Sequence, residues 1–167
     1  MKTHTGSGRS AHRDEVPTEQ VHDAYKVREK LPEPTVCPDC GAVYRQGRWV
    51  WASAPEGAHR TRCPACRRTH DRYPAGRVTI GGGFFAQHRD EVLNFVKNCE
   101  ARAKAEHPME RIIAIEDQPD GTSITTTTST RLARRIADGL HEAWKGTLDL
   151  HYDKQQELVR ARWTRER

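Results

Sequence analysis

The sequence has few apolar and aromatic residues for its length. Apolar residues make up 35% of the 167 positions and aromatic residues 7%, whereas charged residues make up 31%. No apolar run approaches the roughly 20 residues that span a bilayer, and the N-terminus has no apolar segment of the secretory type. We therefore expect a cytoplasmic protein with no membrane partner, a modest core and some disordered chain.

Recognisable catalytic motifs are also missing. The sequence has no Gly-x-Ser-x-Gly, and no Gly-Lys-Ser/Thr follows the three glycines at 81–83, so that stretch is not a nucleotide P-loop. The nine histidines form no His-x-x-x-His pair, and the carboxylates are scattered. We therefore expect neither an enzyme nor a small-molecule substrate, and we interpret the glycine stretch as a linker.

Cysteines are few, but four of the five stand in two Cys-Pro-x-Cys pairs: Cys37 with Cys40, and Cys63 with Cys66. Each Cys-x-x-Cys knuckle presents two thiolates to one ion, and two knuckles complete a tetrahedral S4 site of the zinc-ribbon type. Four protein ligands leave no open position for catalysis, which makes the site structural. Redox dithiols are the alternative, and iron could occupy the same sulfur cage.

The residues near the knuckles add detail to this interpretation. Gly41 follows the first knuckle, where a positive φ is commonly needed, but Arg67 takes that place after the second. Trp49 and Trp51 would share one face of a strand, either roofing a small core or stacking on bases, and core packing is favoured for at least one. Cys99 falls on the apolar side of an expected helix and is interpreted as core packing.

The net charge of +5 comes entirely from the cysteine-rich segment. Residues 37–83 hold eight basic and three acidic side chains, whereas the flanking segments are balanced. All eight are arginines, whose planar fork suits phosphate and stacks on bases. This favours nucleic-acid binding over the alternative of a solvated basic face. The candidate contact residues here are Arg45, Arg48, Trp49, Arg60, Arg62, Arg67 and Arg68.

The rest of the chain alternates between helical and strand patterns. We expect helices over 86–106 and from Thr128 or Ser129 to Lys145–Gly146, and strands over 77–80, 111–116, 122–127, 147–152 and 157–163. From residue 84 on, this duplicated α-β-β unit predicts a mostly antiparallel four-stranded sheet with both helices on one face. The fold class is therefore α+β, with a flexible tail at 1–34 (helical near 19–30), a small-β zinc ribbon at 35–83 and an αββαββ domain at 84–167.

A second arginine cluster opens the later helix. Arg131, Arg134 and Arg135 share its solvent side in the first two turns. Cations at this end oppose the helix dipole, while the free N–H groups of a helix N-terminus attract anions. The cluster indicates an external phosphate partner, with a solvated face as the alternative.

Several motifs resemble a known family. The stretches "CPDCGAVYRQGRW", the second "CPAC", "YPAG", the "HP.ERI" strand entry and "TTTTSTRLARRI" resemble a family of short, poorly characterised bacterial zinc-ribbon proteins. These are similar to the archaeal and eukaryotic nuclear-export adaptor of the large ribosomal subunit, whose cysteine-rich N-terminal region docks on that subunit. The match covers roughly residues 20–165 for the bacterial family and only scattered motifs for the adaptor.

This chain departs from the adaptor in two ways. It has one four-cysteine site where the adaptor has two, and it lacks the adaptor's later domains and export signals, so export is not implied. What the resemblance implies is binding to the ribosome or to ribosomal RNA, with ribosomal proteins as further partners. We therefore expect a zinc-binding, ribosome-associated RNA-binding protein that uses its arginine-rich ribbon. The alternative is a zinc-ribbon protein–protein adaptor that binds no nucleic acid.

Overall fold

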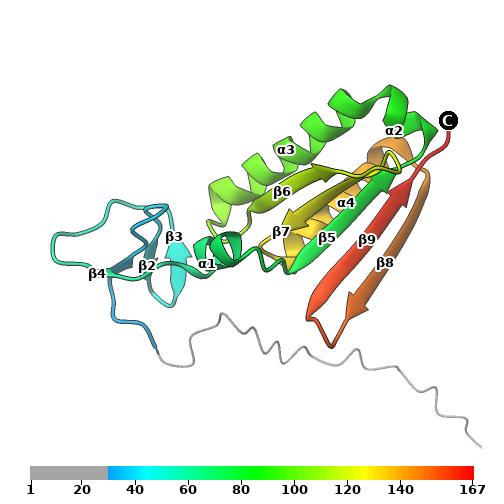
Figure 1. Cartoon of the computed structure of the whole chain (residues 1–167). Coiled ribbons are helices and arrows are strands. Elements are labelled where there is room, and N and C mark those ends of the chain that lie inside the picture. Colours follow the sequence, from blue (N-terminus) through cyan, green and yellow to red (C-terminus); the bar gives the residue numbers. More distant parts are fainter. Residues whose placement is uncertain (1–29) are drawn as a thin grey trace, which may run out of the picture.

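The computed structural model describes residues 30–167, which form a small part and a larger part (Figure 1). The small part contains β1 (Thr35–Val36), β2 (Val43–Arg45), β3 (Arg48–Val50), β4 (His59–Arg60) and α1 (Pro64–Asp71). The larger part contains β5 (Gly76–Gly81), α2 (Gly83–Gln87), α3 (Arg89–Glu106), β6 (Ile112–Asp117), β7 (Ser123–Thr127), α4 (Thr130–Trp144), β8 (Thr147–Asp153) and β9 (Leu158–Thr164). The tail expected at 1–34, with its helix near 19–30, falls almost wholly outside the described residues.

The small part is a four-stranded sheet in the order β3-β2-β1-β4. β1 pairs antiparallel with β2 and parallel with β4, and β2 and β3 form a hairpin. Two of these strands are only two residues long. The buried apolar cluster of this part is correspondingly small and consists of Cys37, Cys63 and Ala65. The cysteines therefore stand where a larger domain would place its hydrophobic core.

The larger part is built on a five-stranded sheet in the order β6-β7-β5-β9-β8. Its central strand, β5, pairs antiparallel with β7 and parallel with β9, so the sheet is mixed. The prediction of a four-stranded sheet, with the strand at 77–80 assigned to the ribbon, is therefore wrong. Val78 and Ile80 are fully buried in the core that the larger sheet shares with α3 and α4. The ribbon consequently ends before β5, and the boundary expected at 83–84 cuts through the α+β part.

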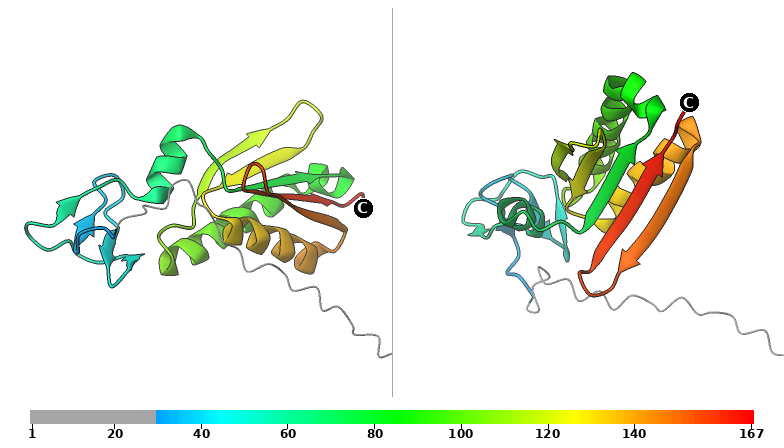
Figure 2. Two further views of the ribbon diagram at one scale, coloured as in Figure 1. Left: turned by 90° about the horizontal axis from the view of Figure 1, so that it is seen from below. Right: turned by 45° about the vertical axis from the view of Figure 1, so that its right-hand side comes forward.

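Helices α3 and α4 lie side by side against one face of this sheet, as the sequence predicts (Figure 2). Val159, Ala161 and Trp163 alternate along β9 and are buried against the helices. The indole N–H of Trp163 donates to the carbonyl of Lys145, 2.6 Å away, so its polar atom is satisfied. Within residues 30–167 no helix is both long enough and apolar enough to cross a bilayer.

Most element boundaries of the α+β part follow local sequence signals. Ser129 caps α4 by accepting a hydrogen bond from the N–H of Leu132 at 3.0 Å, and α3 ends before His107 and Pro108. The strands expected in this part correspond to β6, β7, β8 and β9 with shifts of one residue at most. This half of the chain is therefore encoded mainly by amphipathic periodicity and by capping.

The three-glycine segment at the end of β5 is a close-packed corner and not the free linker that the sequence suggests. Gly82 has a φ of +99°, and a Cβ placed on it would lie 2.2 Å from the carbonyl oxygen of Arg165. The backbone of Arg165 is hydrogen-bonded to both sides of this corner, because its N–H donates to Gly81 and its carbonyl accepts from Phe84. Glycine is needed here because two backbones meet, and the short helix α2 starts directly afterwards.

Candidate metal centre and the arginine surfaces around it

The first knuckle lies between β1 and β2. Cys37 and Cys40 flank a tight turn in which the N–H of Gly41 donates to the carbonyl of Cys37 at 2.9 Å. Gly41 has a φ of +81°, as expected from its place after the knuckle. The N–H of Ala42 points at the sulfur of Cys40, 3.5 Å away. Both thiols are therefore held by backbone geometry.

The second knuckle is the start of α1, a helix that the sequence analysis did not predict. Cys63 is the N-cap, and its sulfur accepts from the N–H of Cys66 at 3.3 Å. Pro64 occupies the first helical position, where its missing N–H costs nothing. Because Arg67 lies inside this helix, its φ does not need glycine, which explains the difference from the first knuckle. In the sequence, the Cys-Pro dipeptide is the signal that indicates the start of this helix.

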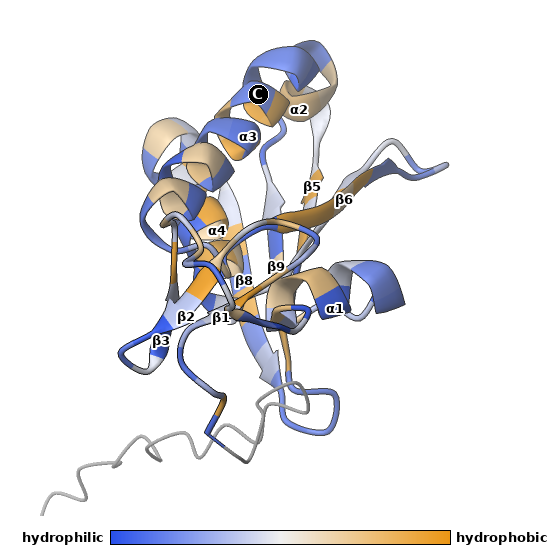
Figure 3. Ribbon diagram, turned by 90° about the vertical axis from the view of Figure 1, so that its left-hand side faces the viewer, coloured by the Kyte–Doolittle hydropathy of each residue, from blue (hydrophilic) through white to orange (hydrophobic). Residues whose placement is uncertain are grey.

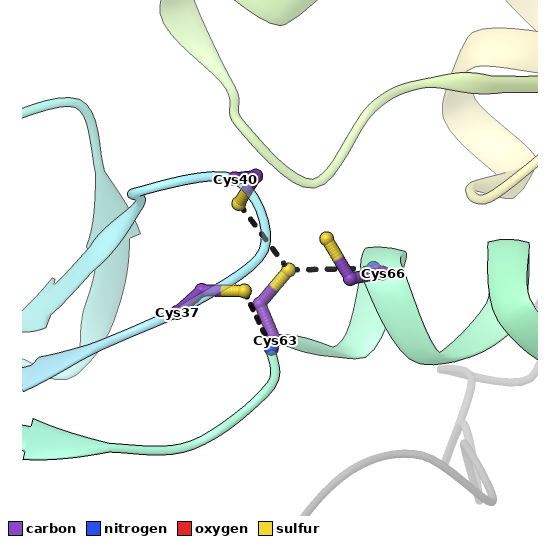
Figure 4. A group of neighbouring side chains, drawn as sticks. All are labelled: Cys37, Cys40, Cys63 and Cys66. Carbon is purple, nitrogen blue, oxygen red and sulfur yellow. Dashed lines mark hydrogen bonds between the residues drawn. The ribbon is translucent and has the colours of Figure 1, made fainter.

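The four knuckle sulfurs converge on one point (Figure 4). All four ligand atoms lie within 4.8 Å of one another, and the sulfurs of Cys40 and Cys63 are 3.8 Å apart. A tetrahedral zinc site with Zn–S bonds of about 2.3 Å places its sulfurs about 3.8 Å apart. Cys37 and Cys63 are buried and none of the four is disulfide-bonded. The group can hold a metal ion, and its thiolates are the donor set of zinc and iron.

The thiols differ in how readily they ionise. Burial raises the pKa of Cys63 and Cys66. Burial would also raise the pKa of Cys37, but N–H groups of Cys63, Cys40 and Asp39 lower it to about 7. Because the thiolate is the metal ligand, metal binding near neutral pH must displace protons from Cys63 and Cys66. The metal-bound state carries fewer protons, so metal affinity rises with pH.

Arg111, from the α+β part, reaches into this site and was not among the predicted residues. Its guanidinium donates to the sulfurs of Cys63 at 3.1 Å, Cys66 at 3.3 Å and Cys40 at 3.5 Å. Burial would lower the pKa of Arg111, but the thiol contacts outweigh it and raise the pKa above its ordinary value. No spacing rule connects Arg111 to the cysteines, because the sequence separation is at least 45 residues.

The two tryptophans of the β2–β3 hairpin have different roles. Trp49 packs against the cysteine cluster and contacts the ring of Tyr44 with centroids 5.4 Å apart, which confirms the expectation that one tryptophan completes the ribbon core. Trp51 is 39% exposed, and its indole N–H donates to the carbonyl of Lys104 at 2.6 Å. Trp51 therefore joins the ribbon to the last turn of α3.

The ribbon arginines are mostly accessible, with one exception. Arg45 and Arg48 are exposed near the tip of the hairpin, where hydrophilic residues gather (Figure 3). Arg60 is also exposed, whereas Arg62 is half-buried and ion-paired with Asp39, and Arg67 is half-buried. Arg68 is only 5% exposed. Its guanidinium donates to the carbonyl of Tyr73 at 3.1 Å and lies over the aromatic ring of the same residue. Arg68 therefore has a structural role.

The α4 arginines line a groove between α3 and α4. Arg131, Arg134 and Arg135 are joined there by Arg102 of α3, which the sequence analysis missed, and the groove has a volume of about 920 Å³. Arg131 also approaches Glu110, with an N–O distance of 3.8 Å. The acidic residues that line the same groove are Glu106, Asp138 and Glu142. The structure thus separates the predicted arginines into a ribbon set and a groove set.

These features define the class of the protein: an α+β protein with a four-cysteine site able to hold a metal ion. No protein-family model, curated protein or solved structure matches the chain.

Proposed function

We propose that this is a zinc-binding protein that binds RNA, with the ribosome or ribosomal RNA as its target. One observation carries the proposal: seven of the eight arginines of residues 37–83 precede β5 and lie in the part of the chain that contains the four converging thiols. Arg45, Arg48 and Arg60 are exposed there. Guanidinium groups on a rigid support suit phosphate recognition.

Zinc is the proposed metal because four thiolates with no open position are its usual structural site. Cys37, Cys40, Cys63 and Cys66 would supply all four ligands. The ion would contribute the folding free energy that a sheet with two-residue strands cannot supply by itself. Elemental analysis of freshly purified protein distinguishes zinc from iron.

The tip of the hairpin supports an anionic partner. Arg45 and Arg48 are directly opposite each other in the β2–β3 register, and like charges in such a pair destabilise a sheet. The turn between them is nevertheless fixed, because the N–H groups of Gln46 and Gly47 donate to the carboxylate of Glu33 at 3.1 and 2.9 Å. An external phosphate would relieve this repulsion. A pre-ordered tip also loses less conformational entropy on binding than a free loop.

Sucrose-gradient sedimentation tests the ribosomal part of this proposal. Native lysate is fractionated, and the protein is detected by blotting in the free, subunit and ribosome fractions at low and high salt. The expected result is co-sedimentation with ribosomal particles at low salt and release at high salt, because phosphate contacts weaken steeply with salt. Protein that remains at the top of the gradient at low salt contradicts ribosome binding.

A protein-docking ribbon is the second candidate, and exposed aromatic residues favour it. Trp51 and Tyr73 are 39% and 44% exposed, and aromatic residues are enriched in protein interfaces. Binding through these rings would depend little on salt. A salt-independent interaction with a ribosomal fraction would therefore favour a protein partner over RNA.

A further inference from the structure

The contact between Arg111 and the cysteine site joins the two parts of the molecule. Three nitrogen–sulfur distances of 3.1–3.5 Å link one guanidinium to Cys63, Cys66 and Cys40. The remaining nitrogen, Nε, donates to the carbonyl of Pro108 at 2.9 Å, which fixes the plane of the guanidinium. The side chain is therefore oriented by the segment that leads into β6 and is directed at the sulfurs of the other part.

The backbone of Arg111 is itself anchored to Thr128, which lies just before the N-cap of α4. Its N–H donates to the hydroxyl of Thr128 at 2.9 Å, and its carbonyl accepts from the N–H of Thr128 at 2.8 Å. Thr128 is buried, and its hydroxyl also donates to the carbonyl of Met109 at 2.6 Å. Met109 in turn packs against the cysteine cluster. Arg111 therefore approaches the sulfurs from a support that the α+β core holds in place.

The positive charge of Arg111 can stabilise a metal ion that is bound by four thiolates. A divalent ion with four thiolates carries a net charge of −2, and a partly buried dianion is costly without a counter-charge. Arginine is suited to this place because its planar fork can serve several acceptors at once, whereas a lysine ammonium acts as a point charge. Hydrogen bonds to metal ligands from outside the coordination sphere typically change metal affinity 10–100-fold.

We propose that Arg111 is a positioning residue of the metal centre: its guanidinium compensates the charge of the metal-bound thiolates and thereby holds the ribbon on the α+β part. This inference rests on the metal-binding half of the proposed function and is independent of RNA. Metal binding and ribbon docking are then linked reciprocally, so the α+β part strengthens metal binding by the same factor by which metal strengthens docking. The hydrogen bond from Trp51 to Lys104 is a further contact between the two parts.

The test measures zinc affinity of the full chain by competition with a chromophoric chelator. The variants are Arg111→Gln, which removes the positive charge, and Arg111→Lys, which keeps the charge but replaces the planar guanidinium with an ammonium group. The control is Arg162→Gln, which removes an exposed arginine on the face of the larger sheet that points away from the helices. The expected affinity loss is about 10–100-fold for Arg111→Gln, smaller for Arg111→Lys and absent for the control.

Small-angle scattering supplies the readout that separates this role from simple stability. Chelation of the metal should increase the radius of gyration of the wild type as the ribbon leaves the α+β part. Arg111→Gln should show the larger radius even with saturating zinc. If Arg111→Gln does not fold, Arg111→Lys decides the matter through its weaker affinity.

Three outcomes oppose the proposal in distinguishable ways. Wild-type affinity in a folded Arg111→Gln overturns the role of Arg111 and leaves the metal site standing. An unchanged radius of gyration on chelation overturns the docking role. A wild type that binds no zinc overturns the metal site and this inference together, whereas absence of RNA binding affects neither.

Discussion

At the scale of single residues, cysteine has two roles in this chain. Cys37, Cys40, Cys63 and Cys66 converge, whereas Cys99 is half-buried on α3 and packs against the helix–sheet core. Burial raises the pKa of Cys99 even though Arg102 and Arg135 lie nearby. Cys99 is therefore expected to remain a protonated packing residue.

This difference predicts opposite results for two conservative substitutions. Cys37→Ser should lose the stoichiometric metal and expose residues 35–71 to proteolysis, because structural zinc contributes about 10–16 kcal/mol to such modules. Cys99→Ser should keep one metal ion per chain. Elemental analysis and mass spectrometry of limited digests measure both effects, and freshly purified wild type without stoichiometric metal would contradict the prediction.

Glu110 makes one arginine of the groove structural. Its side chain is buried, one of its carboxylate oxygens has no hydrogen-bond partner among the described residues, and the other lies 3.8 Å from Arg131. Arg131→Gln should therefore destabilise the fold by up to about 1 kcal/mol and lower the melting temperature by a few degrees. Arg134→Gln, on the exposed side of the same helix, is the matched control. Equal melting temperatures of the two variants in thermal denaturation would show that Glu110 does not need Arg131.

Whether a site residue could be predicted from the sequence depends on how far along the chain it lies from the residues that it contacts. The four ligands could be identified because each pair lies within four residues and the chemistry dictates the spacing. Arg111 and Arg102 could not, because their places at the cysteines and in the groove depend on how α3, β6 and α4 pack. Arg68 was predicted wrongly for the same reason. Its charge indicated an exposed nucleic-acid contact, but its place in α1 directs its guanidinium to the carbonyl of Tyr73.

At the scale of elements, periodicity and caps predicted α3, α4 and the four strands after α3. What they could not supply was the partner of each strand. β5 reads as a strand in the sequence, but only tertiary pairing with β7 and β9 places it at the centre of the larger sheet. α1 was missed because its eight residues carry few apolar side chains, so its signal lay in the cap alone.

The groove between α3 and α4 gives a prediction at this scale. The double variant Arg134→Gln with Arg135→Gln should weaken RNA or ribosome binding and change the melting temperature by no more than a degree or two, because both side chains are exposed. The charge-matched control is Arg160→Gln with Arg162→Gln, on the opposite face of the sheet. Filter binding or fluorescence anisotropy measures affinity, and equal losses in the two variants would mean that only net charge matters.

At the scale of the whole molecule, the excess positive charge is concentrated in the ribbon, the part that contains the four cysteines. Removing one phosphate contact should reduce the slope of log affinity against log salt by about 0.7–0.9. Arg45→Ala with Arg48→Ala should therefore flatten the slope by about 1–2 units and leave the zinc content unchanged. Affinity measured at several salt concentrations tests this. A wild-type slope in the variant, or no slope in the wild type, would favour a protein partner.

The parallel pairing of β5 with β9 also sets the order in which a nascent chain can fold. All four cysteines of the metal site have been synthesised once translation reaches Cys66. Gly76, by contrast, can pair with Val159 only after the chain has been extended to β9. At a synthesis rate of about 5–20 residues per second, this wait lasts on the order of ten seconds. During that time a finished ribbon precedes a central strand whose edge toward β9 is unpaired, and such edges recruit other chains. A chain interrupted before β9 would therefore carry a complete metal site beside an aggregation-prone strand and would be a natural client for chaperones.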